Sequence, residues 1–290
     1  MAALRDIKRK IDAVKKTQQI TRAMNMVAAS KLRTTQQKLE QFIPYATKLT
    51  EIMNRVAAGV DPEDFPLIQP HEETVKVELI SLTADRGLCG AFNTNLISKA
   101  EKFMLEKEEE GLEVSFTLLG RKGRDFFRRR KRAWRNYREG MLDRPNIGDA
   151  TAMGQQAIDL FLTHEVDEVY LCYAEFINMV TQRPVIKKLL PITPPSMEEE
   201  AEEILEYIFE PSREGVLEDL LPNYIHLQIL EAFFQTAVSE HAARMTAMDN
   251  AVNNCKDMVR DLTLVYNKAR QAAITKELMD IVGGVEALKK

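Results

Sequence analysis

The clearest hydrophobic pattern in the chain runs from residue 248 to residue 273. Apolar and small residues recur there at alternating steps of four and three, which is the heptad pattern of a helix packed along another helix. The positions are Met248, Val252, Cys255, Val259, Leu262, Tyr266, Ala269 and Ala273. The pattern predicts a long closing helix, which we expect to follow Pro222 and to run from Asn223 to about Val282.

The same heptad spacing of apolar residues occurs at the start of the chain. It begins with Leu4, Ile7, Ile11 and Val14. No glycine occurs before Gly59, so one long helix is predicted over roughly residues 3–57, with a kink or interruption at Pro44. Gln18 and Thr21 fall on the heptad seam, where polar residues lower stability and can fix the register of the two helices.

Between the two helices, residues 72–194 alternate strand-like and helix-like segments. Strands are predicted at 75–83, 114–119, 134–137, 166–177 and 184–190, with helices at 91–110, 121–130 and 148–164. Such alternation is typical of an α/β sheet covered by helices.

The predicted fold class is therefore α/β, with a long antiparallel coiled coil of the N- and C-terminal helices and a central Rossmann-like α/β domain. The helices are antiparallel if both leave the same side of that domain. The predicted segments are an N-terminal shaft helix over 1–60, the central domain over 72–194, an acidic connector over 195–222 and a C-terminal shaft helix over 223–290.

Charge is strongly segregated although the net charge is only −4. Residues 1–38 carry ten Lys or Arg against two acids, residues 121–138 carry ten against one, and residues 195–222 carry ten acids against one base. Such blocks are either solvated faces or contacts for a polyanionic partner. A coiled-coil adaptor that binds an anionic surface is therefore the main alternative function.

Candidate chemistry is sparse. The three cysteines and four histidines are scattered and show no metal-ligand spacing, and no nucleophile-elbow motif is present. The turn over residues 83–92 has glycines between a strand and a helix, but it lacks the full dinucleotide and phosphate-loop patterns. We interpret Gly87 and Gly90 as a tight turn with close packing, and Cys89 as a residue that fills the turn. An α/β enzyme that uses this turn is a second alternative.

The basic run 128–132 with Trp134 and Tyr137 is not surrounded by a nucleic-acid recognition module, so no nucleic-acid partner is expected. No catalytic, cofactor-binding or metal-binding residue is predicted. No run of 18 apolar residues occurs, so no segment is expected to cross a membrane alone.

Several motifs resemble the gamma subunit of F-type ATP synthases. They are the opening segments 7–11 and 17–31, the segment 85–90 (Asp-Arg-Gly-Leu-Cys-Gly), and the closing segments 240–248 and 264–275. They follow the order of the family and together span nearly the whole chain. The layout expected from the hydrophobic pattern agrees with the layout of that family.

The resemblance implies a central-stalk rotor. The helix pair would turn inside a ring of alpha and beta subunits, with one copy per complex, and would couple ion-driven rotation of the membrane c-ring to ATP synthesis or hydrolysis. An asymmetric shaft makes different contacts with three identical sites and so shifts their conformational equilibria in turn. The chain would itself be non-catalytic, without cofactors, and would also bind the small epsilon subunit.

The resemblance also implies contact residues. Arg270 and Gln271 correspond to positions that hydrogen-bond a loop of beta, while Met24, Lys31 and Arg244 lie where the shaft passes the acidic lever segment of beta. Weaker candidates for contact of the foot with the c-ring or epsilon are Tyr207, Phe209 and Glu210, together with Pro44 and Tyr45. The apolar tail from Leu278 to Leu288 is expected to extend beyond the opening helix and to enter an apolar sleeve.

One departure separates this chain from the plastid members of the family. No two cysteines are close in sequence, so the thiol switch of plastid relatives is not expected. The heptad begins at Leu4 and leaves no room for a presequence, so we expect a bacterial protein that is peripheral to the cytoplasmic face of the plasma membrane.

Overall fold

The computed structural model describes residues 2–57, 64–193 and 212–288. The chain divides into two compact units: residues 1–28 with 245–290, and residues 29–244. Two long helices, α1 (Ala2–Ala57) and α5 (Arg213–Leu288), each contribute to both units.

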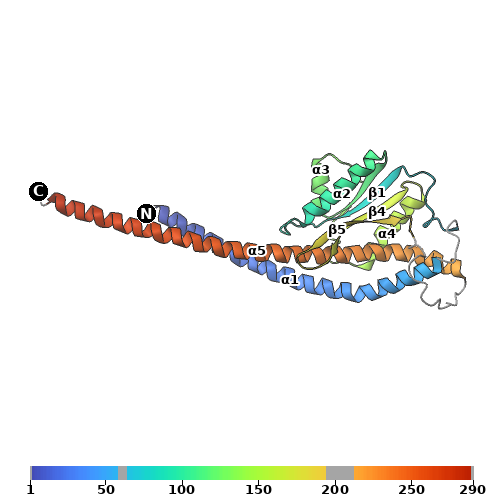
Figure 1. Ribbon diagram of the computed structural model, residues 1–290, viewed down its shortest axis with the longest axis horizontal. Helices are drawn as coiled ribbons and strands as arrows, with labels where there is room; N and C mark the ends of the chain where they lie inside the picture. Colours follow the sequence, from blue (N-terminus) through green and yellow to red (C-terminus); the bar gives the residue numbers. More distant parts are fainter. Residues whose placement is uncertain (1, 58–63, 194–211, 289–290) are drawn as a thin grey trace. The chain divides into compact units, whose positions relative to one another are not determined.

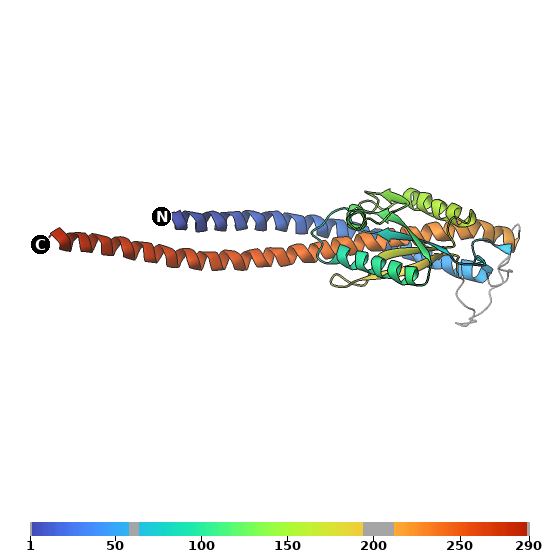
Figure 2. The ribbon, with the colours of Figure 1, turned by 90° about the horizontal axis from the view of Figure 1, so that it is seen from above.

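The first unit is a pair of helices. Figures 1 and 2 show the beginning of α1 and the end of α5 side by side and running in opposite directions. The Asn25 side-chain amide donates a hydrogen bond of 2.8 Å to the Met245 carbonyl oxygen and marks the level at which the two helices face each other.

Burial along this pair follows the predicted heptads. Every predicted seam position of α5 from Met248 to Ala273 is buried or half-buried, and most residues between them are exposed. The same is true of α1 at Leu4, Ile7, Ile11 and Val14, and the polar Gln18 and Thr21 lie on the seam as expected. The predicted fold class is confirmed.

The closing helix is longer than its partner in this unit. From the level of Asn25 and Met245, α1 has 24 residues left to the N-terminus, which brings its end level with about residue 269 of α5. The remainder of α5 continues past the start of α1, and its large apolar residues there, including Ile274, Leu278 and Ile281, are about half exposed or more.

The second unit contains a five-stranded sheet of order β3-β2-β1-β4-β5. The strands are β1 (Lys76–Leu82), β2 (Glu113–Leu119), β3 (Asn136–Arg138), β4 (Glu168–Phe176) and β5 (Gln182–Leu190). The first four are parallel, and β5 is antiparallel to β4. The three connecting helices are α2 (Phe92–Glu109), α3 (Arg121–Arg129) and α4 (Ile147–Leu162).

The strand order explains which helices cover which face. The chain moves outward from β1 through β2 to β3 and then crosses back to β4, so right-handed crossovers place α2 and α3 on one face and α4 on the other. Leu79, Phe116 and Cys172 pack with Leu96 of α2 and Phe127 of α3 in one buried cluster. Side chains alternate along a strand, so the neighbouring Ile80 faces the opposite side.

Pro44 does not interrupt the opening helix, and Pro222 does not precede the closing helix as predicted. Helix α1 continues through Pro44, and α5 begins at Arg213, ten residues before the predicted start, with Pro222 inside it. A proline inside a helix removes one backbone hydrogen bond and costs about 3 kcal/mol. Burial of Leu217, Leu221 and Ile225 on both sides of Pro222 offsets that cost, since a buried Leu or Ile side chain contributes roughly 1.5–3 kcal/mol.

The acidic connector predicted over 195–222 is therefore partly helix. Residues 213–222 form the first turns of α5, and residues 194–211 lie outside the described part of the chain. None of the described helices is long and apolar enough to cross a membrane.

Gly120, which follows β2, lies so close to the backbone of Thr83 that a side chain there should destabilise the domain. Its φ of +92° lies in the region that favours glycine, and a Cβ there would sit 1.9 Å from the Thr83 carbonyl oxygen. We expect Gly120→Ala to lower the free energy of unfolding by more than about 3 kcal/mol, because backbone atoms cannot move aside easily.

Gly111 is the matched control. Its φ is +87°, but a Cβ would have open space around it. Gly111→Ala should cost only the strain of the left-handed backbone, about 1–2 kcal/mol. Urea unfolding of both variants checks this, and equal losses would mean that the contact with Thr83 does not matter.

Candidate functional site

The carboxyl-end edge of the parallel strands is where ligands bind in many open α/β sheets, especially where the strand order reverses. Here the reversal lies at β1, which has β2 on one side and β4 on the other. The turn after β1, residues 83–91, leads from this edge into α2.

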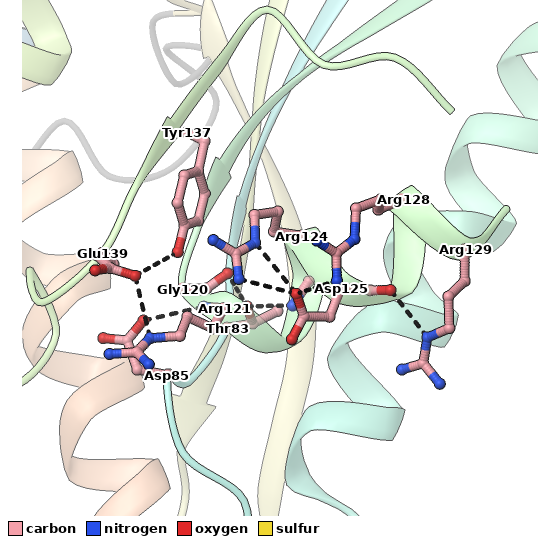
Figure 3. A network of polar contacts seen from close by, with 11 residues as sticks. Thr83, Asp85, Gly120, Arg121, Arg124, Asp125, Arg128, Arg129, Tyr137 and Glu139 are labelled. Atoms are coloured by element: carbon pink, nitrogen blue, oxygen red, sulfur yellow. Dashed lines mark hydrogen bonds and ion pairs between the residues drawn. The ribbon is translucent and has the colours of Figure 1, made fainter. Parts of the chain in front are cut away.

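The chain's own side chains occupy this edge. Asp85 accepts hydrogen bonds from the backbone N–H of Arg121, at the start of α3, and from that of Gly140, after β3, at 3.0 and 2.8 Å. The Thr83 hydroxyl donates to the Leu119 carbonyl oxygen and accepts from the Gly123 N–H, both at 2.9 Å. Figure 3 shows Thr83 and Asp85 within this network. Since a carboxylate already lies at the amino end of α3, that helix end is not an open phosphate site.

The rest of the turn is also held from inside. The Asn93 side chain accepts from the Ala84 N–H at 2.9 Å and donates to the Cys89 sulfur at 3.1 Å. Cys89 is buried, and burial raises the pKa of its thiol, so it lacks the exposed thiolate of a nucleophile. Gly90 has a φ of +59°, which fits the predicted tight turn, whereas a side chain at Gly87 would make only ordinary contacts at 3.6 Å. The close-packing role predicted for Gly87 is therefore wrong.

Several charged side chains of the basic helix α3 pair with other groups of the same domain. Arg124 donates two hydrogen bonds to Asp125, which lowers the pKa of that carboxyl, and its guanidinium lies 4.6 Å from the centre of the Tyr137 ring. The Tyr137 hydroxyl donates to Glu139, which also pairs with Arg121 at 3.1 Å. Burial raises the pKa of Tyr137 to about 12. Figure 3 shows these groups meeting one another at the sheet edge.

Two of the predicted contact residues, Lys31 and Arg244, lie beside this edge. The Lys31 ammonium pairs with Asp143 at 2.5 Å and lowers the pKa of that carboxyl. Arg244 donates to Glu240 at 2.6 Å and to the Gly87 carbonyl oxygen at 3.3 Å.

His241 lies among these charges and is 2% exposed. Burial, reinforced by Arg244 and Lys31, lowers its pKa to about 4, and its Nδ1 has no hydrogen-bond partner among the described residues. The imidazole is therefore neutral in the folded chain at pH 7.

The other predicted contacts of the shaft lie in the helix pair. Met24 is half-buried beside the seam, while Arg270 and Gln271 are exposed on α5, close to the level at which α1 begins. The predicted foot contacts Tyr207, Phe209 and Glu210 lie outside the described residues, and Tyr45 is exposed on α1. These assignments remain predictions. No group of three or more potential metal ligands occurs in the part of the chain that the structure describes.

Sequence reasoning missed Asp85, Asp143 and Glu240 as partners of the predicted residues. Glu240 could have been found, because it stands four residues before Arg244 on one helix face. Asp85 lies inside the motif over residues 85–90, but the backbone N–H groups that it binds, those of Arg121 and Gly140, are far away in sequence. Nothing in the sequence around Asp143 indicates that it meets α1.

A helix pair built from both ends of one chain, with an α/β domain inserted between them, is the architecture of a shaft-like subunit. The ATP synthase family model (ATP-synt) matches residues 3–288. The gamma chain of Syntrophobacter fumaroxidans is 58% identical and that of Syntrophus aciditrophicus is 50% identical, each over the full length of both chains. The chain therefore belongs to the ATP synthase gamma-chain family.

Solved structures share the fold. The rotor of the Euglena gracilis mitochondrial ATP synthase matches with a TM-score of 0.65 at 20% identity, over 94% of this chain and 99% of the other. The central stalk and c-ring structure from Tetrahymena thermophila matches with a TM-score of 0.60 at 23% identity, over 80% of this chain and 99% of the other. At these identities the similarity is evidence for the fold alone.

The buried His241 makes stability depend on pH. Its pKa is lower in the folded chain than the usual 6.5, so the unfolded chain binds more protons between pH 6.5 and about 4. Stability is therefore full above pH 6.5 and falls as the pH drops towards 4. We expect the protonation of His241 to lower the free energy of unfolding by on the order of 2 kcal/mol between pH 7 and pH 5.

Replacing His241 with Phe should remove that contribution, because Phe cannot be protonated. Urea unfolding of the wild-type chain and the variant at both pH values measures the difference. A variant that loses as much stability as the wild type on acidification would show that His241 is not the responsible group.

Proposed function

We propose that this chain is the central-stalk rotor of an ATP synthase, which couples rotation of an ion-driven c-ring to ATP synthesis or hydrolysis in a ring of alpha and beta subunits. The observation that carries the proposal is the helix pair of residues 2–28 and 245–288. Its apolar seam is used internally, whereas its outer surface exposes both cationic and apolar side chains.

The asymmetry of this pair supports the mechanism. Two unlike helices of unequal reach present a different surface in each direction, so a turning pair makes different contacts with three chemically identical sites. Each site is then biased towards another conformation by the contacts it receives. The role we assign to the chain is mechanical, and the catalytic residues belong to the surrounding ring.

We assign one copy to each complex, with alpha, beta, epsilon and c-ring subunits as partners, at the cytoplasmic face of a bacterial plasma membrane. The basic residues of 1–38 support an acidic surrounding surface, since six of them, Arg5, Lys8, Arg9, Lys10, Lys15 and Lys16, are exposed along the first turns of α1. Exposed charges attract over about 8–10 Å at physiological salt, so they can act at many angles of rotation.

Purification of the native complex tests the assignment. We expect one copy of this chain for every three beta subunits, and rotation of a probe fixed to it when ATP is added. A symmetric homodimer without alpha or beta subunits would contradict the proposal and favour the coiled-coil adaptor.

Arg270 and Gln271 are proposed to bind the ring near the end of the shaft. Both are exposed, and a guanidinium offers forked donors that can bind and release carboxylates or carbonyls. Arg270→Ala/Gln271→Ala should lower ATP turnover or coupling about tenfold, which corresponds to the roughly 1.4 kcal/mol of one hydrogen bond to a charged group, without preventing assembly. Turnover and proton pumping measured on the purified variant complex check this.

Met24 is proposed to face an acidic surface of beta. A Met24→Lys substitution adds a cation there and should impair coupling by binding too tightly, while ATP hydrolysis continues. The matched control is Met24→Leu, which changes packing but not charge. If the Leu variant were equally uncoupled in proton-pumping assays, the defect would come from packing in the helix pair instead.

A further inference from the structure

Six charged side chains from four parts of the second unit meet in one place. Lys31 comes from α1, Glu240 and Arg244 come from α5, Asp85 and Arg86 follow β1, and Asp143 follows β3. Lys31 and Arg86 both lie near enough to Asp143 to act on its carboxyl, and Asp85 and Asp143 both act on Glu240. Three cations and three anions balance, so the cluster has no formal net charge.

Within this cluster, the loop that follows β3 binds α1. The loop after β3 begins at Gly140, whose N–H donates to Asp85 at 2.8 Å. Met141 and Leu142 of the loop are buried, and Asp143 then pairs with Lys31 at 2.5 Å. The Lys31–Asp143 pair thus joins α1 to the loop that follows β3.

The turn that follows β1 binds α5. Gly87 lies two residues after Asp85, and its carbonyl oxygen accepts from Arg244. The Arg244 and Glu240 side chains are only 13% and 9% exposed, so little of either remains for an outside partner. Asp85 thus joins the two segments, because it lies in the same turn as Gly87 and accepts from the Gly140 N–H of the loop that carries Asp143. Its other oxygen accepts from the Arg121 N–H at the start of α3.

We propose that Lys31 and Arg244 act within this chain, as a junction that ties both shaft helices to the α/β domain, and that Asp85 positions the two segments they bind. This inference rests on the proposed rotor function and changes the role of two residues within it. All residues of the junction belong to the second compact unit, residues 29–244. In a rotor, both helices would then turn together with the domain.

A charge swap separates this role from contact with the ring. Lys31→Glu places two carboxylates face to face, and Asp143→Lys places two ammonium groups together. Each single variant should lower the melting temperature of the full chain by about 2–4 °C and lower coupling in the reconstituted complex. The Lys31→Glu/Asp143→Lys double variant should recover most of both losses, because the pair is restored with its signs exchanged.

Lys38→Glu is the matched control. Lys38 is exposed on the same helix as Lys31. The Lys38→Glu substitution changes the net charge by the same amount as Lys31→Glu. Combining Lys38→Glu with Asp143→Lys should restore nothing, which shows that recovery depends on the pair rather than on net charge.

Asp85→Asn tests the positioning role. Its amide cannot accept at both oxygen positions, so exchange of the Arg121 and Gly140 backbone hydrogens should quicken about tenfold, with the fold otherwise retained. Unchanged exchange at both positions would remove Asp85 from the junction.

The outcomes also separate this inference from the proposed function. If the wild-type complex pumps protons and the double variant remains as defective as Lys31→Glu alone, Lys31 meets an acidic group outside this chain and the junction is refuted. If the wild-type chain does not assemble with the ring, the rotor function fails, and recovery of the melting temperature in the double variant of the isolated chain still decides whether the junction exists.

Discussion

The structure depends on the heptad seam that joins the two ends of the chain. Each seam side chain contributes a modest amount of buried apolar surface, and neither helix could hold its length in water without a partner. Because the partner comes from the other end of the same chain, folding the helix pair requires the whole α/β domain to close between its two ends. The seam thus links the most distant parts of the sequence.

The seam is not uniformly apolar. Gln18, Thr21 and Asn25 occupy consecutive seam positions of α1, and Asn25 alone of these donates a hydrogen bond to α5. Polar seam residues lower stability and favour one register. In the second unit, larger apolar contacts such as Phe42 with Phe234, whose ring centres are 5.7 Å apart, replace them.

Much of this fold could be predicted from local pattern. The seam positions from Met248 to Ala273 follow from their spacing, and the strands follow from short apolar runs bounded by glycine or charge. Pro222 was misleading because proline is a local signal, and the burial of Leu217, Leu221 and Ile225 that overrides it is a tertiary effect. Contacts such as Asp143 with Lys31 could not be predicted, since a surface loop carries no period that indicates its partner.

The candidate site was predicted in part for the same reason. A family resemblance identifies Lys31, Arg244, Arg270 and Gln271 as important positions, but not what each of them touches. Arg270 and Gln271 are exposed, as a contact for another subunit requires, whereas Arg244 is largely buried against its own chain. Burial and hydrogen bonding, which only the folded chain reveals, thus divide one predicted set into outward-facing and inward-facing residues.

The two ends of this chain form one antiparallel helix pair, and a cross-link between them tests this most directly. Stepping eleven residues towards the N-terminus from Asn25 and ten towards the C-terminus from Met245 brings Val14 level with the native Cys255, and both lie on the seam. Under mild oxidation, Val14→Cys should form a disulfide with Cys255 within one chain, whereas a cysteine at the exposed Lys16 should not. Failure of the Val14→Cys chain to cross-link, or cross-linking only between separate copies, would contradict the account.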